Sequence, residues 1–517
     1  MRAGSLVGAA AGIAGVTVLA RAVGFGRTAV LSRTLGASCV GDTYQAVNAL
    51  PNVVFEVVAG GALAAVVVPL LAGAVASGDH ESAGRTTSAL LTWTVAVLLP
   101  VALLGVLVAP GLVRALLGPD PSCGEAALRA GTRMLRVFMP QVLLYGVGIV
   151  LAGVLQAHRR FLGPALAPLL SSVVVVTAYL LYAARGAAPL PDLPRSQELV
   201  LSVGTTLGVA ALSLGLLVPL RRTGLHLRPT WHFPPGTAAR AGALAASGLA
   251  GLLAQQVALL VALHLAANDR EGSVVVLTVA TAVFLLPWSV LAVPVATSAF
   301  PRLAAAADLG DEQEYAVVAG RSLRVVLLAS ALGWAVLQAC APLLGRLLVL
   351  GAPGAGDPAA LSAAVSAFLP GLVGYGLLAL LGRALLARGD TRTPAAATAG
   401  GWLVVAVADL LLVGGTDLPR VVALGLGNSI GLSVGGALLL VSVRRAVPAA
   451  LRGVGRAAAA ALAALLASGL VLLLPAPEST SVVVTLAALA GLAALSAAVF
   501  ALVVSLVDRS TWQVVRG

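Results

Sequence analysis

Apolar residues run along the whole chain in long blocks, which are separated by short segments rich in charged residues, glycine or proline. A helix needs about 20 mainly apolar residues to cross the hydrocarbon layer of a membrane, so each block predicts a membrane span. The fourteen predicted spans lie at 5–31, 45–76, 87–111, 131–155, 163–184, 197–220, 239–264, 274–301, 318–342, 360–386, 394–413, 420–442, 452–474 and 481–507. The pattern predicts an all-α polytopic membrane protein.

The first block has the features of a retained helix rather than of a signal peptide. Only Arg2 precedes it as a charge, and no cleavage site of small residues follows before the next span. We therefore expect fourteen spans in the mature chain, with both chain ends on the same side of the membrane.

Composition agrees with this interpretation and excludes several other classes. The 517 residues are 59% hydrophobic and only 10% charged, whereas soluble domains average about 25% charged residues. Three cysteines, Cys39, Cys123 and Cys340, are too few and too scattered for a disulfide framework. The formal charge of +12 comes from arginines spread between apolar blocks. Because they form no long basic run, we expect no nucleic-acid partner.

The arginines predict the orientation, because cytoplasmic loops of membrane proteins carry an excess of basic residues. With the N-terminus inside, 20 arginines fall in cytoplasmic segments and eight in outside loops, or ten if Arg133 and Arg136 are added. The eight are Arg33, Arg114, Arg129, Arg185, Arg195, Arg270, Arg346 and Arg420. We expect both chain ends to face the cytoplasm.

The sequence also contains an internal duplication, which is common in transporters. VPLLAGAVASGD resembles FPRLAAAADLGD with an offset of 232 residues, and APGLVRALLG resembles APLLGRLLVLG with the same offset. AHRRFLGP then aligns with ARGDTRTP at an offset of 230. Since six spans separate the copies, both have the same orientation. We predict an N-lobe at 1–222, a C-lobe at 223–446 and two added helices at 447–517, in the V-shaped arrangement of alternating-access transporters.

Charged side chains inside a span are costly in lipid and are therefore functional candidates. Arg21 and Arg27 lie within the first span, on either side of Gly24-Phe25-Gly26, where a bend would expose backbone amides. Two guanidinium groups suit a phosphate or pyrophosphate, which they can bind bidentately. The alternative is that both arginines are structural and pair with Asp42 or Glu56.

Three acidic residues complete this set of candidates. Asp42 opens the second span, and Glu56 lies deeper in it, after Pro51-Asn52. We include Asp42, Asn52 and Glu56 among the substrate-binding candidates; Glu56 could also pair with an arginine, bind a proton or face water. Asp409, late in the eleventh span, is the candidate for coupling to a cation or proton.

Signatures of enzymes and metal sites are absent from the sequence. There is no HExxH, P-loop, paired CxxC or serine nucleophile elbow, and the histidines lack metal-ligand spacing. We expect no catalytic residues, no metal and no cofactor.

Several segments resemble the MurJ/MviN family of bacterial lipid II flippases, within the multidrug/oligosaccharidyl-lipid/polysaccharide exporter superfamily. They are the segment at 19–71, LQAHRRFLGPALAPLL at 155–170, LPWSVLAVPVATSAFPRL at 286–303 and LLARGDTRTP at 385–394. The resemblance covers all fourteen spans, and it is specific in the first two spans and in the two loops between the fourth and fifth spans of each copy.

The resemblance implies a plasma-membrane flippase that moves lipid II, an undecaprenyl-pyrophosphate-linked peptidoglycan precursor, to the outer leaflet. In the family, a cationic cavity receives the headgroup, and a groove beside the two extra helices takes the lipid tail. Arg21 and Arg27 fall on the family's first-helix cavity arginines, and Asp42 on its acidic residue at the start of the second span. Proteins of cell-wall synthesis are the further partners that this role implies.

Two departures from the family pattern bear on cargo and coupling. The chain has Phe55-Glu56 and Ala282 where many members carry further arginines, so it is either a subgroup that manages with Arg21 and Arg27 or a paralogue with another polyprenyl-linked cargo. Asp409 falls where many members have asparagine, near a sodium site proposed in some. No acid follows one turn later, at Val413, so membrane potential, Na⁺ and H⁺ all remain candidates for coupling.

Two other hypotheses stay open at this stage. A cation-coupled drug exporter of the same superfamily would use Glu56 or Asp409 as its coupling acid. A membrane scaffold for cell-wall enzymes would tolerate neutralisation of every charge inside the membrane.

Overall fold

The computed structural model describes residues 19–20, 22–57, 64–118, 123–186, 188–225, 227–233, 249–349, 352–354, 356–474 and 481–508. Over these residues the protein consists of helices and their connections, without a named strand. Twelve described helical segments are long and apolar enough to cross a membrane. They correspond to the third to fourteenth predicted spans, so the all-α membrane fold is confirmed. The first two predicted spans lie partly outside the described residues.

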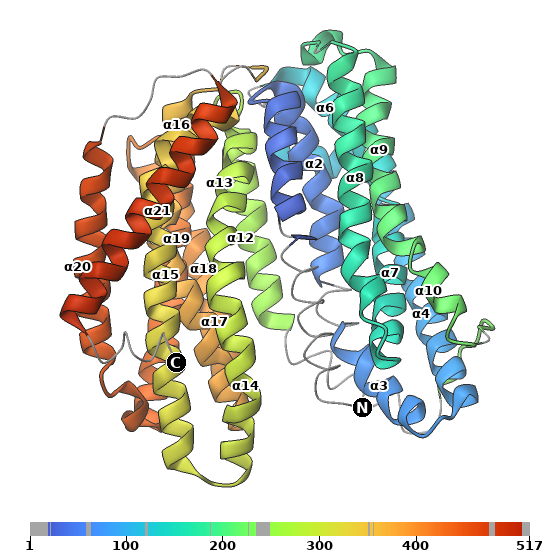
Figure 1. The fold of residues 1–517 in the computed structure, drawn as a ribbon. Helices are drawn as coiled ribbons and strands as arrows, with labels where there is room; N and C mark the ends of the chain where they lie inside the picture. The colour runs from blue at the N-terminus through green and yellow to red at the C-terminus, as the bar shows by residue number, and fades with distance from the viewer. Residues whose placement is uncertain are drawn as a thin grey trace. The chain divides into compact units, whose positions relative to one another are not determined.

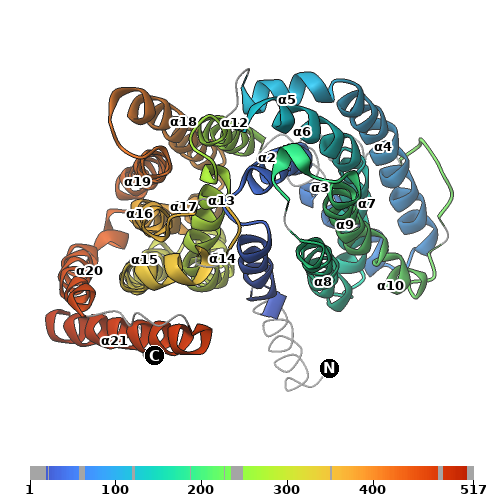
Figure 2. The same cartoon turned by 90° about the horizontal axis from the view of Figure 1, so that it is seen from above.

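The chain divides into two compact units, and each consists mostly of one copy of the repeat. The first unit contains residues 1–256 together with 267–275 and 352–355. Its helices are α2 (Cys39–Phe55), α3 (Ala64–Ala76), α4 (His80–Leu107), α5 (Ala109–Leu117), α6 (Gly124–Phe138), α7 (Gln141–Ala157), α8 (Leu162–Ala184), α9 (Arg195–Leu214) and α10 (Leu217–Arg221). Residues 22–34 are also helical and precede α2. In Figures 1 and 2, α8 and α9 lie side by side along their length.

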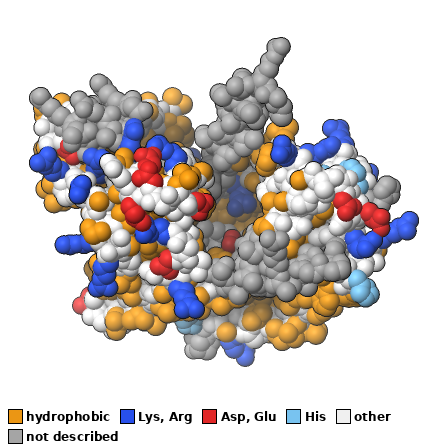
Figure 3. Space-filling model, turned by 90° about the horizontal axis from the view of Figure 1, so that it is seen from below, with side chains coloured by type: hydrophobic (Ala, Val, Ile, Leu, Met, Phe, Trp, Pro, Cys, Tyr) orange, Lys and Arg blue, Asp and Glu red, His pale blue; other side chains and the backbone are white. Residues whose placement is uncertain are grey.

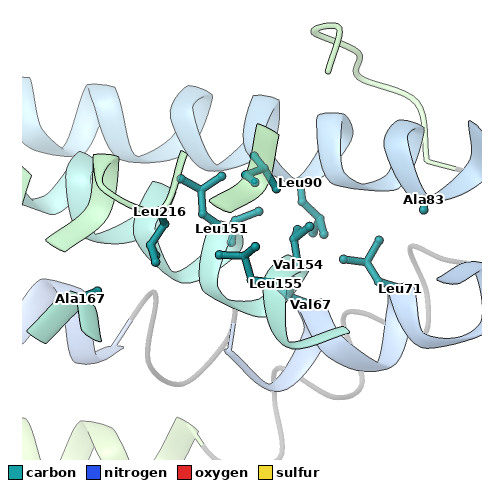
Figure 4. Close-up of a cluster of buried hydrophobic side chains, with 11 residues drawn as sticks. Val67, Leu71, Ala83, Leu90, Leu151, Val154, Leu155, Ala167 and Leu216 are labelled. Atoms are coloured by element: carbon teal, nitrogen blue, oxygen red, sulfur yellow. The ribbon is translucent and has the colours of Figure 1, made fainter. Parts of the chain in front are cut away.

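The core of the first unit is built around α7. Val67 and Leu71 of α3 meet Leu151 and Leu155 of α7, and all four are fully buried (Figure 4). Leu90 of α4 closes the cluster from another side. Because lipid is as apolar as these side chains, tight packing rather than the hydrophobic effect stabilises such contacts inside a membrane.

The second unit contains the second copy and the two added helices. Its helices are most of α12 (Leu249–Ala267), α13 (Ser273–Pro287), α14 (Val293–Asp308), α15 (Glu312–Val349), α16 (Pro358–Phe368), α17 (Gly371–Ala387), α18 (Arg392–Gly415), α19 (Arg420–Ala446), α20 (Val454–Gly469) and α21 (Val482–Val507). Helices α20 and α21 lie beside α15 at the margin of this unit (Figures 1 and 2). Small residues of α15 and α20, including Ala331 and Ala464, pack with Phe500 of α21.

Helix boundaries repeat at the predicted offsets, so the duplication is confirmed at the level of structure. Helices α4 and α15 begin 232 residues apart, at His80 and Glu312, and α7 and α17 begin 230 apart, at Gln141 and Gly371. The last span of each copy aligns at an offset of 223, which pairs LSVGTTLGVAALSLGLLVPLRR at 201–222 with LGLGNSIGLSVGGALLLVSVRR at 424–445.

The second span of each copy contains a π-helical turn at an equivalent position. Residues 56 and 57 after α2 are π-helical, and so are Trp288–Ala292 between α13 and α14. An offset of 232 places residue 56 on residue 288. Such turns are rare, bend a helix and are frequent at functional sites. The second span of each copy therefore has a point at which the helix can bend.

Candidate functional site

Helix α2 carries Asp42 near its start and Asn52 near its end, and Glu56 directly follows its last residue. Ser38 caps the helix by accepting a hydrogen bond from the amide of Gly41 at 3.2 Å. Asp42 lies in the first turn, about 21 Å along the axis from Glu56 at 1.5 Å per residue. Asn52 and Glu56 are four residues apart and so share a face. The helix therefore places Asn52 with Glu56, and Asp42 elsewhere.

Asp42 is buried and directs both carboxylate oxygens at backbone amides. Its Oδ2 accepts from the amide of Gly272 at 2.6 Å, and its Oδ1 accepts from that of Val275 at 2.9 Å. Gly272 directly precedes α13, Val275 lies in its first turn, and both residues belong to the first unit. A carboxylate at this position satisfies orphan amides and interacts favourably with the helix dipole. Asp42 thus holds the start of the eighth span; its assignment as a substrate-binding residue stays a prediction.

A second carboxylate makes the reciprocal contact at the start of α2. Glu271 accepts a hydrogen bond from the backbone amide of Cys39 at 2.9 Å. Cys39 is also joined to Cys123 by a disulfide, which ties the start of α2 to the residue before α6. This bond was not predicted from the sequence. Its signal was topological, because both cysteines fall in loops predicted to lie on the outside, where disulfides form.

Arg27 lies on the described helical segment 22–34, whereas Arg21 lies outside the described residues. The Arg27 side chain is exposed in the first unit. Its positive charge acts electrostatically on the hydroxyls of Tyr44, Tyr145 and Tyr179. These three tyrosines lie on α2, α7 and α8. Arg27 takes part in none of the ion pairs found among the described residues, which leaves its donors available to an anion.

The tyrosines beside Arg27 form an ordered network. The Thr205 hydroxyl donates to the carbonyl of Leu201 at 2.7 Å. Since that hydroxyl has one proton, Tyr44 must donate to Thr205, at 2.6 Å, and Tyr179 then donates to Tyr44, at 3.0 Å. All three side chains are buried. This chain of hydrogen bonds fixes the orientation of the Tyr44 and Tyr179 side chains.

Glu56 lies at the π-helical turn that follows α2. Its charge acts on Tyr145, the tyrosine that Arg27 also influences, and Phe55 places its ring 4.5 Å from the Tyr145 ring. Glu56 is exposed, so its carboxylate can meet water or cargo. Asn52 donates to the carbonyl of Asn48 at 2.9 Å and keeps its side-chain oxygen available. The charges of Arg27 and Glu56 thus both act on Tyr145.

The second unit repeats the aromatic part of this arrangement without the charges. Trp288 occupies the position of Glu56, and Tyr375, at an offset of 230 from Tyr145, stacks on it with centroids 4.2 Å apart. The Trp288 ring nitrogen donates to the Tyr375 carbonyl at 3.3 Å. Phe284 extends the stack beyond Tyr375.

Asp409 on α18 is deeply buried in the second unit, with an exposed fraction of 1%. Its Oδ1 has no hydrogen-bond partner among the described residues, and neither has the side-chain nitrogen of Asn428 on α19. The repeat places Asp409 on Tyr179 and Asn428 on Thr205, the two residues that Tyr44 links in the first unit. A polar pair that is satisfied in one copy is therefore unsatisfied in the other. No group of three potential metal-ligating side chains exists in the described part of the chain.

Comparisons with known proteins agree on one family. The model described as "Lipid II flippase MurJ" matches residues 31–504. The curated lipid II flippase MurJ of Burkholderia cenocepacia is 28% identical over 429 residues, covering 81% of this chain and 80% of the relative. A probable lipid II flippase MurJ of Rhizobium tropici is 25% identical over 402 residues, covering 77% and 74%.

Solved structures share the fold. A structure of the lipid II flippase MurJ in an inward closed conformation matches with a TM-score of 0.74 at 18% identity, covering 94% of this chain and 98% of that one. An inward-facing MATE family multidrug resistance transporter of the MOP superfamily matches with a TM-score of 0.68 at 15% identity, covering 84% and 95%.

Proposed function

The chain belongs to the family of MurJ lipid II flippases, and we propose that its cargo site lies in the first unit, where Arg27 binds the pyrophosphate of lipid II. The protein is a multi-pass protein of the bacterial inner membrane and a transporter rather than an enzyme. It moves lipid II for peptidoglycan synthesis.

The observation that carries the site is an arginine inside a membrane span with no carboxylate partner among the described residues. A guanidinium in this place without a carboxylate in direct contact is costly unless it faces water or an anion. Ordered tyrosines on one side and Glu56 nearby leave Arg27 oriented for an incoming phosphate, which it can bind bidentately. In this proposal Arg21 extends the site along the same span, as the sequence predicts.

Glu56 has a different role in this proposal, because a carboxylate repels pyrophosphate. When the site is empty, Glu56 balances the charge of Arg27 across Tyr145. When cargo arrives, the π-helical turn lets this part of α2 move, and Glu56 swings away. Asp42 acts only as a positioning residue, through the start of α13.

Complementation of a bacterium depleted of its own flippase tests the site. We expect Arg27→Ala to abolish growth at normal protein level. Arg27→Lys should support growth in part, since lysine keeps the positive charge but lacks the paired donors of the guanidinium group. The matched control is Arg85→Ala, which removes an exposed arginine paired with Glu81. Normal growth with Arg27→Ala would refute the site. Drug efflux without rescue of growth would favour the exporter hypothesis instead.

We further propose that both chain ends face the cytoplasm. The arginine distribution supports this orientation, and the Cys39–Cys123 disulfide supports it independently, since it joins two loops assigned to the oxidising side. In intact cells of a Cys340→Ala variant, a membrane-impermeant maleimide should label the protein only after treatment with a reductant. Labelling that requires permeabilised cells would reverse the orientation.

Coupling forms a third element of the proposal, with Asp409 as the site of a cation or proton. A buried carboxylate with an unpartnered oxygen is stabilised when Na⁺ or H⁺ neutralises it. The unpartnered Asn428 nitrogen on the neighbouring helix marks the same region as incompletely satisfied. If Asp409→Asn leaves transport with an unchanged dependence on Na⁺ and pH, coupling to membrane potential alone becomes the better account. Contact with cell-wall synthesis proteins stays a prediction from the sequence.

A further inference from the structure

A cleft opens on the first unit, between the start of α8 and the end of α9 with α10. Its volume is about 790 Å³. Three arginines line it: Arg159 and Arg160 precede α8, and Arg222 follows α10. The remaining lining residues are mostly apolar and include Phe161, Leu162, Leu166, Leu170, Gly215 and Val218.

The three arginines concentrate positive charge without a carboxylate partner in the described part of the chain. Arg160 is held in place by the end of α10, because its guanidinium donates to the carbonyls of Arg222, at 2.7 Å, and Pro219, at 3.4 Å. Helix α8 also begins without a side-chain cap at Phe161, so its first amides add to the positive potential. This end of the cleft suits a phosphate group.

Arg159 adopts a backbone conformation that non-glycine residues rarely take. Its φ is 58°, and among the described residues it is the only non-glycine residue with a positive φ. The repeat places Arg159 on Gly389, whose φ is 81°. The second copy thus has glycine, which adopts this conformation without strain. The first copy has an arginine there, which costs conformational free energy. A strained residue that is retained at a cleft indicates a role for its side chain.

The rest of the cleft is apolar and exposed on membrane-spanning helices. Leu162 and Val218 have exposed fractions of 61% and 64%, and Leu166 and Leu170 continue the wall along α8. An exposed apolar wall on a span faces lipid chains. Figure 3 shows the end of the molecule on which these loops lie, with arginine side chains in blue beside hydrophobic ones in orange.

The second unit has a cleft of the same construction. Its volume is about 630 Å³, and its lining includes Arg392, Ala396, Leu438 and Arg445. These residues align with Leu162 and Leu166 at an offset of 230 and with Gly215 and Arg222 at an offset of 223. Here, however, Asp390 accepts from the amides of Arg392 and Thr393, at 3.1 and 3.0 Å.

Asp390 is not a lining residue, but it lies two residues before the lining residue Arg392 at the start of α18, and its negative charge makes the second cleft the poorer anion site. Hydrogen bonds from Thr393 and from the amide of Arg392 lower the pKa of Asp390, which keeps it charged. The first cleft has Arg160 at the equivalent position. Two clefts with one architecture therefore differ in net charge at their basic end.

We propose that the α8–α10 cleft binds an anionic phospholipid, with its phosphate at Arg159, Arg160 and Arg222 and an acyl chain along Leu162, Leu166 and Val218. Basic clefts between spans at the membrane surface recognise anionic headgroups, and the apolar wall requires a ligand with a chain. The α18–α19 cleft binds the same lipid more weakly. This site is separate from the cargo site at Arg27 and does not depend on the identity of the cargo.

Native mass spectrometry of the purified full-length protein, titrated with dioleoylphosphatidylglycerol, tests the proposal. The test variant is Arg159→Gln/Arg222→Gln, which spares the Arg160 contacts. The control, Arg452→Gln/Arg456→Gln, removes the same charge from exposed arginines that line neither cleft. Two surface arginines contribute about one order of magnitude to the affinity for an anionic lipid. The most tightly bound lipid should therefore bind about tenfold more weakly to the test variant, and its affinity for the control should be unchanged. Dioleoylphosphatidylcholine should bind weakly to every form.

Several outcomes would overturn the proposal. They are equal affinity of the test variant and wild type, equal loss in the control, or equal binding of phosphatidylcholine. Displacement of the lipid by millimolar inorganic phosphate would assign the cleft to free phosphate. Stronger binding of undecaprenyl pyrophosphate than of phosphatidylglycerol at this cleft would assign it to the cargo.

A second experiment keeps the proposal falsifiable if the double variant does not fold. Photoactivatable phosphatidylglycerol incubated with the wild-type protein should crosslink to residues 159–170 or 211–222. Adducts confined to other spans would contradict the site. Arg159→Gly separates a role of Arg159 in lipid binding from a role in stability. This variant should bind the lipid more weakly, while its unfolding temperature stays unchanged or rises.

Discussion

The two copies of the repeat use the same bend in their second span for different chemistry. In the first unit the π-helical turn presents Glu56, near Arg27 and Tyr145. In the second unit the equivalent turn presents Trp288, stacked on Tyr375. Both copies thus have the π-helical turn and the tyrosine, whereas only the first copy has the charged residues Arg27 and Glu56. In our proposal, the anionic cargo therefore binds in the first unit, and the second unit provides an apolar counterpart.

A second contrast runs in the opposite direction. Tyr179 and Thr205 are joined through Tyr44 in the first unit, whereas their counterparts Asp409 and Asn428 keep unpartnered polar atoms in the second. Our proposal therefore assigns cargo binding to the first unit and coupling to the second. Alternating access would couple the two processes.

Truncation of the aromatic stack should have the largest effect on stability. Trp288→Ala removes the ring that packs on Tyr375, and loss of a large packed aromatic side chain costs about 3 kcal/mol or more. Phe55→Ala removes the ring that packs on Tyr145 in the first unit, one residue before the position of Trp288, and should cost clearly less. Thermal unfolding of the purified variants measures the difference; equal costs would show that the two turns are packed alike.

Substitution of a glycine where α18 and α19 pack closely together should have the second-largest effect on stability. A methyl group at Gly431 would collide with the backbone of Val405 and Gly401, which cannot rotate away. At the equivalent Gly208 the nearest obstacle is the Val175 side chain. We expect Gly431→Ala to cost about 2 kcal/mol and Gly208→Ala about half as much, since overpacking is relieved more easily by side chains. If Gly208→Ala is the more destabilising variant in the same thermal assay, this ranking is wrong.

Neutralisation of the coupling candidate should reduce transport about tenfold, which corresponds to about 1.4 kcal/mol. Asp409→Asn keeps the size of the side chain but removes its affinity for a cation or proton, so the response of transport to Na⁺ or pH should flatten. The matched variant is Tyr179→Phe, which removes one hydroxyl at the equivalent position and should leave that response intact. A flattened response in both variants would point to packing instead.

Relief of backbone strain should have the smallest effect. Arg159→Gly places glycine at a positive φ and should raise stability by about 1 kcal/mol, the approximate cost of a left-handed conformation. Gly389→Ala introduces that cost at the equivalent turn and should lower stability by a similar amount. Unfolding temperatures that move in the same direction for both variants would contradict the equivalence of the two turns.

The sequence was sufficient for features that depend on local pattern. Apolar blocks predicted the described spans, and matching segments predicted the duplication that the boundaries of α4 and α15 confirm. Arg27 and Glu56 were predicted as neighbours of one site, and both influence Tyr145. Contacts between distant segments could not be predicted in this way. Neither the Asp42 contact with the start of α13 nor the Cys39–Cys123 bond leaves a periodic signal, because each depends on how loops meet in three dimensions.

Binding of undecaprenyl pyrophosphate to the purified protein tests the central claim most directly, since it separates the pyrophosphate site from transport and growth. Isothermal titration of wild type, Arg27→Gln and the control Arg85→Gln gives the three affinities. We predict that Arg27→Gln weakens binding at least tenfold, as loss of a charge-assisted bidentate contact requires, and that Arg85→Gln binds as wild type does. Wild-type affinity of Arg27→Gln would contradict the assignment of the cargo site to the first unit at Arg27.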